Sequence, residues 1–352
     1  MSQRILIVGA GPTGLTAAVE LARQGVIPTV IERRPGASQL SRAVGILQHS
    51  MDIFAPSGVA EAIDAEAVRF AGVIFHQGAS RIARLPLNFS DRSRIWGLAQ
   101  DRTEAHLSAA FTRCGGRIRY GAALETLTQD GDGVSVTVEG APERYDLVIA
   151  ADGIHSTVRQ TLGLSFDGYD LPDRWSIADV ESDDWPDADH FKGYLLPEGK
   201  VAVVVPLERT RFRVIASAPD ALKALPVPMA VCKIRRSGAF TISVRQVSAY
   251  QKGRVFLAGD AAHCHSPVGG RGMNLGIADA ADLVGRILSG RTDGYHAARH
   301  AAGAHVLRLS ENARQLLQSQ SGAKRAVLRT VFRVAAAVPP LGRVLMEQFV
   351  SR

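Results

Sequence analysis

The start of the chain alternates between short apolar runs and a glycine-rich stretch. Residues 4–8 form a strand-length run, continuously apolar after Arg4 and bounded by Gly9, which is typical of a strand buried on both faces in a parallel sheet. A helical apolar pattern follows over residues 15–22 and stops at Gly25, and a second strand is expected at Thr29–Glu32. This order of strand, glycine loop, helix and strand predicts a βαβ unit.

The glycine loop, Gly9-Ala10-Gly11-Pro12-Thr13-Gly14, has the spacing of a dinucleotide-binding turn. Its first glycine permits the tight turn, its second lets a pyrophosphate approach the backbone, and its third lets helix and strand pack closely. The start of the following helix offers free N–H groups and a positive dipole to phosphates. Glu32, at the end of the second strand, is expected to accept a hydrogen bond from a ribose. The pattern does not distinguish FAD from NAD.

Two arginines follow Glu32 and raise the question of a 2′-phosphate site. Arg33 and Arg34 have the charge for such a clamp, but they also fit a solvated turn before Pro35. Glu32 would repel a 2′-phosphate, so the sequence does not predict an NADP site here. Arg33 is kept as a candidate that stacks on, or contacts a phosphate of, the bound dinucleotide.

The pattern of predicted elements changes at about residue 164, in the middle of the chain. Strands are expected at 118–120, 123–127, 134–138 and 146–150, the last leading into Asp152-Gly153. Further strands, separated by prolines, are expected at 175–180, 192–196, 200–207, 211–217 and 239–246. This second group predicts an antiparallel sheet inserted into the first unit.

A second glycine cluster lies near residue 260. A strand at 255–258 leads into Gly259-Asp260, and residues 267–274, Pro-Val-Gly-Gly-Arg-Gly-Met-Asn, open an amphipathic helix that reaches residue 288. The N–H groups of this loop are suited to a partial negative charge, and Asp260 to a polyol hydroxyl beside a pyrophosphate. No metal site is expected at residues 263–265, His-Cys-His, because no distant Cys/His pair completes a tetrahedral set.

The amino-acid composition narrows the classes of protein to which the chain could belong. Apolar residues make up 46% of the 352 residues and charged residues 21%, as in an ordinary globular protein. Three isolated cysteines and the lack of an apolar run of ~18 residues predict a cytoplasmic protein without a transmembrane segment. Of the net charge of +7, +5 lies in residues 323–352, and nucleic-acid binding is not predicted because the sequence shows no nucleic-acid-binding fold.

The basic C-terminal segment is expected to be an amphipathic helix. Its apolar stripe is Val327, Leu328, Val331, Phe332 and Ala335, and arginines recur every four residues beside it. One interpretation packs this stripe on the dinucleotide-binding domain with the arginines solvated. The other lays the helix on an anionic membrane surface.

Taken together, the motifs resemble the fingerprints of class A flavoprotein monooxygenases, the FAD-dependent aromatic hydroxylases of the p-hydroxybenzoate hydroxylase type. The resemblance rests on the first glycine loop with Glu32, on Asp152-Gly153 with Arg159, and on residues 259–274. Ser41-Arg42-Ala43 and residues 100–107, beginning Gln-Asp-Arg-Thr-Glu, are similar to its polyketide-tailoring branch. The resemblance implies an α/β fold: a Rossmann-like FAD-binding domain, an inserted antiparallel β-sheet substrate domain and C-terminal helices.

The resemblance also implies domain boundaries and site residues. The FAD-binding domain would comprise residues 1–70, 97–163 and 250–300, the substrate domain 71–96 and 164–249, and the C-terminal helical segment 301–352. The implied cofactor-binding residues are Gly9, Gly11, Thr13, Gly14, Glu32, Arg33, Arg42, Gln100, Asp152, Asp260, Gly270, Gly272, Met273 and Asn274. The implied catalytic group at the flavin ring is Pro267, Gly269 and Gly270.

The implied reaction is hydroxylation of an aromatic or polycyclic phenolic substrate. NAD(P)H, visiting transiently, would reduce FAD, and O2 would then give a flavin C4a-hydroperoxide that transfers one oxygen. One alternative keeps the fold but makes the chain a flavin oxidoreductase or dehydrogenase. Another, motivated by the short segment 217–237, is a non-catalytic flavoprotein partner of another oxygenase.

Overall fold

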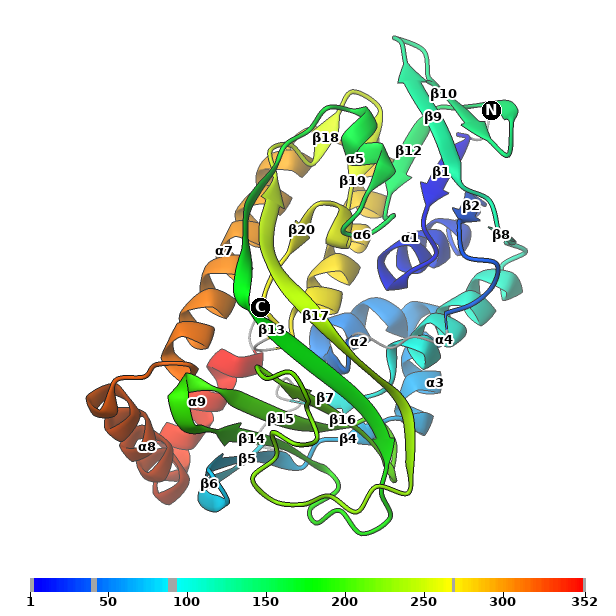
Figure 1. Cartoon of the computed structure of the whole chain (residues 1–352). Helices are drawn as coiled ribbons and strands as arrows, with labels where there is room; N and C mark the ends of the chain where they lie inside the picture. Colours follow the sequence, from blue (N-terminus) through cyan, green and yellow to red (C-terminus); the bar gives the residue numbers. More distant parts are fainter. Residues whose placement is uncertain (1–2, 39–42, 88–93, 268–269, 351–352) are drawn as a thin grey trace.

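A computed structural model describes residues 3–38, 43–87, 94–267 and 270–350 (Figure 1). A six-stranded sheet has the order β18-β19-β12-β1-β2-β8. Its strands are β1 (Ile5–Val8), β2 (Thr29–Glu32), β8 (Ile118–Tyr120), β12 (Leu147–Ala150), β18 (Gln251–Lys252) and β19 (Val255–Leu257). β1 lies between β12 and β2 and is parallel to both, and all four of its residues are buried. This is the Rossmann-like sheet that the apolar runs predict.

Six α-helices lie among the described residues before residue 290. They are α1 (Pro12–Ala22), α2 (Gln48–Phe54), α3 (Val59–Glu66), α4 (Gln100–Arg113), α5 (Thr157–Thr161) and α6 (Gly272–Leu288). Of these, α1 follows β1 and α5 follows β12 of this sheet. Three short 3-10 helices are η1 (Ala55–Ser57), η3 (Pro197–Gly199) and η4 (Gly259–Ala261). α1 packs against both α4 and α6, so the helix of the first glycine loop touches the helix of the second.

An eight-stranded sheet forms the second large unit, with the order β20-β17-β13-β16-β15-β14-β5-β6. Its strands are β5 (Gly72–Gln77), β6 (Ser80–Pro86), β13 (Phe166–Glu181), β14 (His190–Leu195), β15 (Val201–Pro206), β16 (Arg211–Ala216), β17 (Lys233–Val247) and β20 (His263–Cys264). It is antiparallel, as expected, except where β14 pairs with β5 in parallel. The strands predicted at 175–180 and 239–246 are parts of the much longer β13 and β17, which run side by side toward the six-stranded sheet (Figure 1).

The two faces of this sheet bury different partners. Val203 and Val205 point to the face that packs on Val44 and Ala99, next to the nucleotide-binding unit. Val204 points to the opposite face, which is covered by residues 218–231. The short segment 217–237 therefore covers the outer face of the sheet with its residues 218–231.

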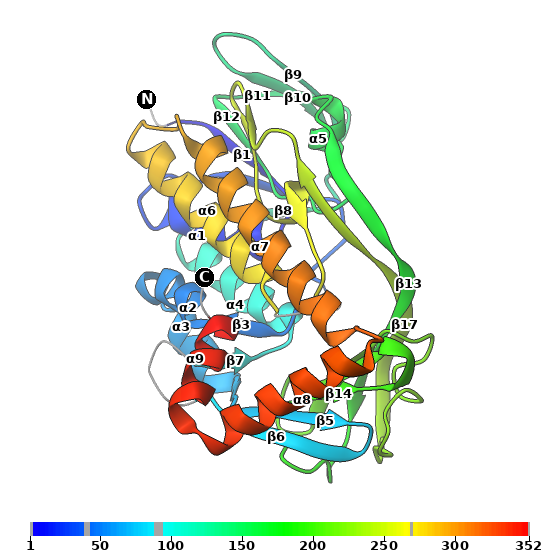
Figure 2. The ribbon, with the colours of Figure 1, turned by 90° about the vertical axis from the view of Figure 1, so that its left-hand side faces the viewer.

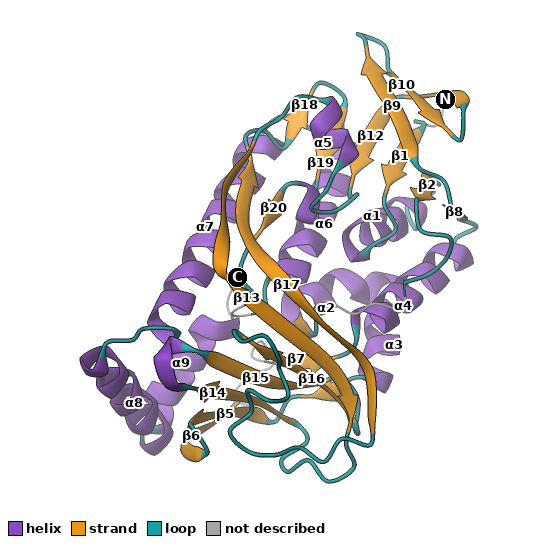
Figure 3. Ribbon diagram, viewed as in Figure 1, coloured by secondary structure: helices purple, strands orange, loops and turns teal. Residues whose placement is uncertain are grey.

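Two three-stranded sheets complete the β structure of the described residues (Figure 3). One contains β9 (Leu124–Gln129), β10 (Val134–Val138) and β11 (Ala141–Tyr145). The other contains β3 (Gly45–Leu47), β4 (Val68–Arg69) and β7 (Ile95–Gly97). In the sequence, the strands of this second small sheet lie where the chain passes from one large sheet to the other. Helix α2, which follows β3, packs against α6.

The C-terminal helices are α7 (Tyr295–Leu317), α8 (Gly322–Ala337) and α9 (Pro339–Val350). Figure 2 shows α7 alongside α6, and α8 across the end of the eight-stranded sheet. Leu328, Phe332 and Ala335 are buried, and the Phe332 ring stacks on Phe75 of β5 at 4.0 Å. The expectation that this stripe packs on the nucleotide-binding unit is wrong, because its apolar partners belong to the eight-stranded sheet. No helix within the described ranges is long and apolar enough to cross a membrane.

Candidate functional site

The first glycine turn has two positions that admit no side chain. Gly9 has φ of 105°, and a Cβ there would lie 2.3 Å from the Ala151 carbonyl oxygen. A Cβ on Gly14 would lie 2.0 Å from the carbonyl oxygen of Gly9. A Cβ on Gly11 would meet nothing within 4 Å. Gly9 and Gly14 therefore serve the fold, whereas Gly11 leaves open space beside the backbone for a ligand.

The start of α1 is suited to an anion. Gly11 is its N-cap, no side chain caps it, and its first turn carries no acid. Behind the turn, the buried Glu32 carboxylate accepts from the Ala10 and Arg34 N–H groups, both at 2.9 Å. Burial alone would raise the pKa of Glu32, but Arg34 and the Ala10 N–H lower it overall. The carboxylate is thus fixed in its ionised form beneath the turn.

The two arginines after Glu32 differ in their surroundings. Arg33 is exposed, whereas Arg34 pairs with Glu32 at 3.0 Å and with Glu104 at 3.5 Å. Gln100 donates to Glu104 at 2.8 Å and accepts from the Ala43 N–H at 3.0 Å. Arg34 and Glu104 were not among the predicted site residues. Glu104 could have been found, because it lies one helical turn after Gln100 in the same motif.

The Asp152-Gly153 motif, together with Arg159, joins the two glycine turns. Asp152 follows β12 and accepts from the Val158 N–H at 3.2 Å, while its Oδ1 is buried without a hydrogen-bond partner among the described residues. Burial raises the pKa of Asp152. The buried Arg159 donates to the carbonyl oxygens of Ile154 at 2.7 Å and Ala261 at 2.9 Å. Arg159 therefore ties the Asp152 loop to the second turn.

Several predicted residues meet in one small pocket at the carboxyl ends of β1 and β2. Among its lining residues are Gly9, Glu32, Arg33 and Asp152. The pocket lies where open α/β sheets usually bind ligands. The structure thus brings the first and second motifs together, although they are far apart in the sequence.

The second glycine turn, η4, packs directly on the first helix. Gly259 has φ of 61°, and a Cβ there would lie 2.4 Å from Thr13 Oγ1. A Cβ on Gly276 of α6 would lie 2.3 Å from the same atom. Asp260, the next residue after Gly259, is exposed. Thr13 therefore packs α1 against α6, and its predicted contact with a pyrophosphate stays a prediction.

The loop before α6 is held by Asn274. The Asn274 amide accepts from the Leu47 N–H at 2.9 Å and from Ser50 Oγ at 2.8 Å, and it donates to the carbonyl oxygens of Gly45 and Gly270. This buried amide is engaged with the protein, so its predicted ligand contact would be indirect.

The remaining predicted residues of this loop differ in exposure. Pro267 and Gly270 are exposed, and the Gly270 N–H donates to the Pro267 carbonyl at 3.0 Å. Met273 is buried, and Gly272, partly buried, begins α6, whose N-terminus has no side-chain cap. Arg42 and Gly269 lie outside the described residues. The roles assigned to this group stay predictions.

In the His263-Cys264-His265 segment His263 is buried, and Cys264 and His265 are partly buried. Burial raises the pKa of the Cys264 thiol to about 12 and lowers the pKa of His265 to about 4. His265 Nδ1 lies 2.8 Å from the Ser266 carbonyl oxygen. Within the part of the chain that the structure describes, no group of three His, Cys, Asp or Glu side chains is placed to hold a metal ion.

The eight-stranded sheet carries a buried ion pair on the face toward the nucleotide-binding unit. Arg213 of β16 makes two hydrogen bonds of 2.7 Å to Asp179 of β13, and its exposed fraction is 0%. Arg213 also donates to the Ala43 carbonyl at 3.4 Å. On the same sheet, Tyr194 and His76 stack on each other with ring centroids 4.6 Å apart, and Tyr194 belongs to the core on the opposite face.

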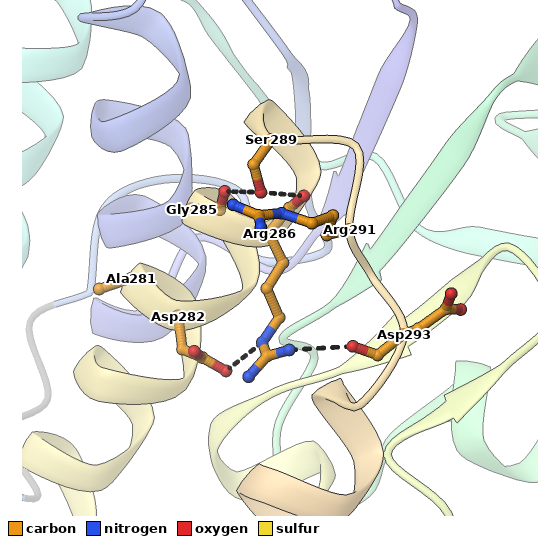
Figure 4. A pocket seen from close by; sticks show the side chains of 7 residues that line it. All are labelled: Ala281, Asp282, Gly285, Arg286, Ser289, Arg291 and Asp293. Atoms are coloured by element: carbon orange, nitrogen blue, oxygen red, sulfur yellow. Dashed lines mark hydrogen bonds and ion pairs between the residues drawn. The ribbon is translucent and has the colours of Figure 1, made fainter.

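A wider surface hollow lies elsewhere, at the C-terminal end of α6 (Figure 4). Its Arg286 is paired with Asp282 at 2.9 Å and donates to the Asp293 carbonyl at 3.0 Å. The opposite end of α6, where the glycine loop enters, is about 25 Å away for a helix of 17 residues. This hollow is therefore separate from the glycine turns.

The chain is similar to several known proteins. A family model described as FAD binding domain matches residues 2–310. Rifampicin monooxygenase of Streptomyces venezuelae is 33% identical over 90% of this chain and 72% of that protein. The 12-dehydrotetracycline 5-monooxygenase/anhydrotetracycline 6-monooxygenase of Streptomyces rimosus is 32% identical over 88% and 68%. The crystal structure of p-nitrophenol 4-monooxygenase from Pseudomonas putida matches with a TM-score of 0.90 and 26% identity over 99% and 98%.

Proposed function

The chain belongs to the FAD-binding family of class A flavoprotein monooxygenases, and we propose that it hydroxylates an aromatic or polycyclic phenol. FAD is the cofactor and NAD(P)H and O2 are the co-substrates of this family. The names of its relatives include a rifampicin, a tetracycline and a nitrophenol monooxygenase, which supports both large and small phenols as substrates. The observation that carries the proposal is that the two glycine turns and Asp152 lie close together at the carboxyl ends of the parallel strands.

The residues present fit FAD. Gly11 leaves space for a pyrophosphate, and the uncapped start of α1 offers N–H groups to its charge. The buried Oδ1 of Asp152 lacks a partner among the described residues, as expected for an acceptor that a ligand hydroxyl would satisfy. Asp260 is exposed, and we assign it to the ribityl side of the cofactor. We infer that these residues, with Glu32 at the adenosine ribose, hold the cofactor.

FAD supplies electron transfer from NAD(P)H and the activation of O2. The protein supplies position, charge and a dry surface. The uncapped start of α6 favours negative charge on a ring placed there, through its N–H groups and dipole. The apolar face that contains Ile177 and Ile215 excludes water from the space toward the nucleotide-binding unit.

The buried ion pair of the eight-stranded sheet, Arg213 with Asp179, is an argument for an uncharged substrate. Arg213 and Arg211 are both buried on this face, and each already has a carboxylate partner: Asp179 binds Arg213 through both of its oxygens, and Glu208 pairs with Arg211 at 3.0 Å. A substrate carboxylate would have to displace Asp179 and leave that carboxylate buried without its partner, at a cost of several kcal/mol. We therefore propose a neutral phenol in preference to an aromatic acid.

The test is oxygen transfer under 18O2. The purified protein with FAD, NADPH or NADH, and a panel of mono- and polycyclic phenols is expected to give a product that carries one 18O atom for each nucleotide oxidised. Paired phenols with and without a ring carboxylate test the preference for neutral substrates. Flavin reduction that is unaffected by any phenol, with no labelled product, would instead support the alternative oxidoreductase or the non-catalytic partner.

Membrane contact through α8 stays a separate prediction. The exposed Val327 and Val331 lie two positions from Arg329, which is about 200° around a helix. The exposed apolar side and the arginine side therefore face nearly opposite directions, as in helices that lie in a membrane interface, but the larger apolar residues Leu328 and Phe332 are already buried against the eight-stranded sheet. The cytoplasmic location predicted from composition stays a prediction as well.

A further inference from the structure

A buried carboxylate holds the second glycine turn from below. Asp279 of α6 accepts from the Gly259 N–H at 3.0 Å. The same oxygen lies 2.6 Å from Nε2 of His263, which follows the turn in β20. The other oxygen accepts from Arg299 of α7 at 2.7 Å. One carboxylate thus joins the turn, the strand after it and two helices, and Figure 2 shows those helices side by side.

This network is sealed from solvent. The exposed fractions of the Asp279 and His263 side chains are 0% and 1%, and that of Arg299 is 14%. Tyr250 lies over His263, and Tyr295 donates to the Leu257 carbonyl of the strand that leads into the turn. Burial alone would raise the pKa of Asp279, but His263, Arg299 and the Gly259 N–H lower it overall.

The placement of the network points to a function beyond packing. Its carboxylate binds the first N–H of the turn, and Arg159 binds the last carbonyl, that of Ala261. Between these two anchors stands Asp260, whose side chain is exposed. An ionised carboxylate that is wholly buried is costly, and apolar residues could pack this helix crossing equally well. The charge is therefore best explained by the orientation of the turn.

We propose that Asp279 is a positioning residue of the FAD site: with His263 and Arg299 it fixes the Gly259 turn so that Asp260 faces the pyrophosphate and ribityl part of the cofactor. This inference rests on the proposed function, in which Asp260 contacts that part of FAD. Asp279 itself does not reach the ligand side of the turn, because Gly259 lies between them.

The test compares FAD affinity among variants of the full-length protein. Asp279→Asn keeps the shape but removes the charge, and Arg299→Gln loosens the same carboxylate from α7. Asp282→Asn is the matched control, because Asp282 lies on the same helix in a partly exposed pair with Arg286, away from the second glycine turn. FAD is titrated into each apoprotein at a temperature where circular dichroism shows all variants folded. The affinity of 5′-AMP, which probes the adenosine end alone, is measured by competition.

We expect Asp279→Asn to weaken FAD binding about tenfold or more, as for one charge-assisted hydrogen bond, and Arg299→Gln to weaken it in the same direction. Asp282→Asn should stay within about twofold, and 5′-AMP affinity should be unchanged in all three. FAD affinity within about twofold of wild type in a folded Asp279→Asn protein would overturn the proposal. Equal losses for FAD and 5′-AMP would do the same, since they indicate general loosening.

If Asp279→Asn does not fold, Arg299→Gln decides by the same criteria. A wild-type protein that binds FAD but transfers no oxygen would contradict the proposed function alone, and the comparison of FAD affinities would still decide the role of Asp279. A wild-type protein that binds no FAD would overturn both.

Discussion

The two glycine turns use the same contact in different surroundings. In each, a buried carboxylate about twenty residues further along the chain accepts a turn N–H: Glu32 from Ala10 and Asp279 from Gly259. Glu32 ends a strand and lines the ligand pocket, and its partner Arg34 is partly solvated. Asp279 lies on a helix, away from any ligand, and its partners are buried. The first carboxylate can therefore both bind and position, whereas the second only positions.

The largest expected effect separates fold from binding within the first turn. Gly14→Ala should destabilise the protein by more than about 4 kcal/mol, because its Cβ would overlap the Gly9 carbonyl. Gly11→Ala should change the free energy of unfolding by about 1 kcal/mol or less, yet weaken FAD binding, since its Cβ enters the ligand space. Chemical denaturation and FAD titration check both. A Gly11→Ala protein with wild-type FAD affinity would contradict this division.

The contact between the two turns gives the next effect. Gly276→Ala should cost about 3 kcal/mol, because its Cβ would meet Thr13 Oγ1. In a Thr13→Ala background the same change should cost clearly less, so a double-mutant cycle should give a coupling energy above about 0.5 kcal/mol. Additive effects in the cycle would mean that Thr13 does not join α1 to α6.

The arginines behind the first turn test its exposed side. Arg34→Gln should destabilise the protein by about 2 kcal/mol, because Glu32 and Glu104 lose their shared cation. The neighbouring, exposed Arg33→Gln should stay within about 0.5 kcal/mol. Thermal unfolding of both variants without FAD measures the difference. Equal losses would show that the ion pairs of Arg34 add nothing to stability.

The pH dependence of stability tests the surroundings of His265, which lies near the second glycine turn. Burial lowers the pKa of His265 from 6.5 to about 4, so the unfolded chain binds the proton more readily. The stability from neutral His265 is present above pH 6.5 and is lost as the pH falls toward 4. Between about pH 7.5 and about pH 5.5 this amounts to about 1 kcal/mol, which His265→Gln should abolish. An identical pH dependence in the variant would refute the assignment.

Much of the fold follows from local patterns in the sequence. The short apolar strands of the six-stranded sheet, the glycine loops and the start of α6 are set by sterics and burial, which act within a few residues. The sequence pattern underestimates the lengths of β13 and β17, because the N-terminal half of each strand is largely exposed and lacks a clear alternation of polar and apolar residues. The packing of α8 was misassigned, since an amphipathic stripe does not specify which surface it meets.

The site was predictable where a motif carries it and not where tertiary contacts do. Glu32 follows from the first loop because a strand end places it at the nucleotide. Arg34, Arg299 and Asp179 matter through partners that are distant in the sequence, which no local pattern reveals. Asp279 had a faint signal, as an acid four residues after Leu275 and four before Leu283 on the buried face of α6.

The most direct test of the account is a crystal structure of the protein with FAD. The account predicts the pyrophosphate within about 3 Å of the backbone N–H groups at the start of α1, with the adenosine at Glu32 and the flavin ring at the start of α6. The Asp279 carboxylate should keep its contact with the Gly259 N–H in that complex. FAD bound with its flavin ring away from the start of α6, or a Gly259 turn released from Asp279, would contradict it.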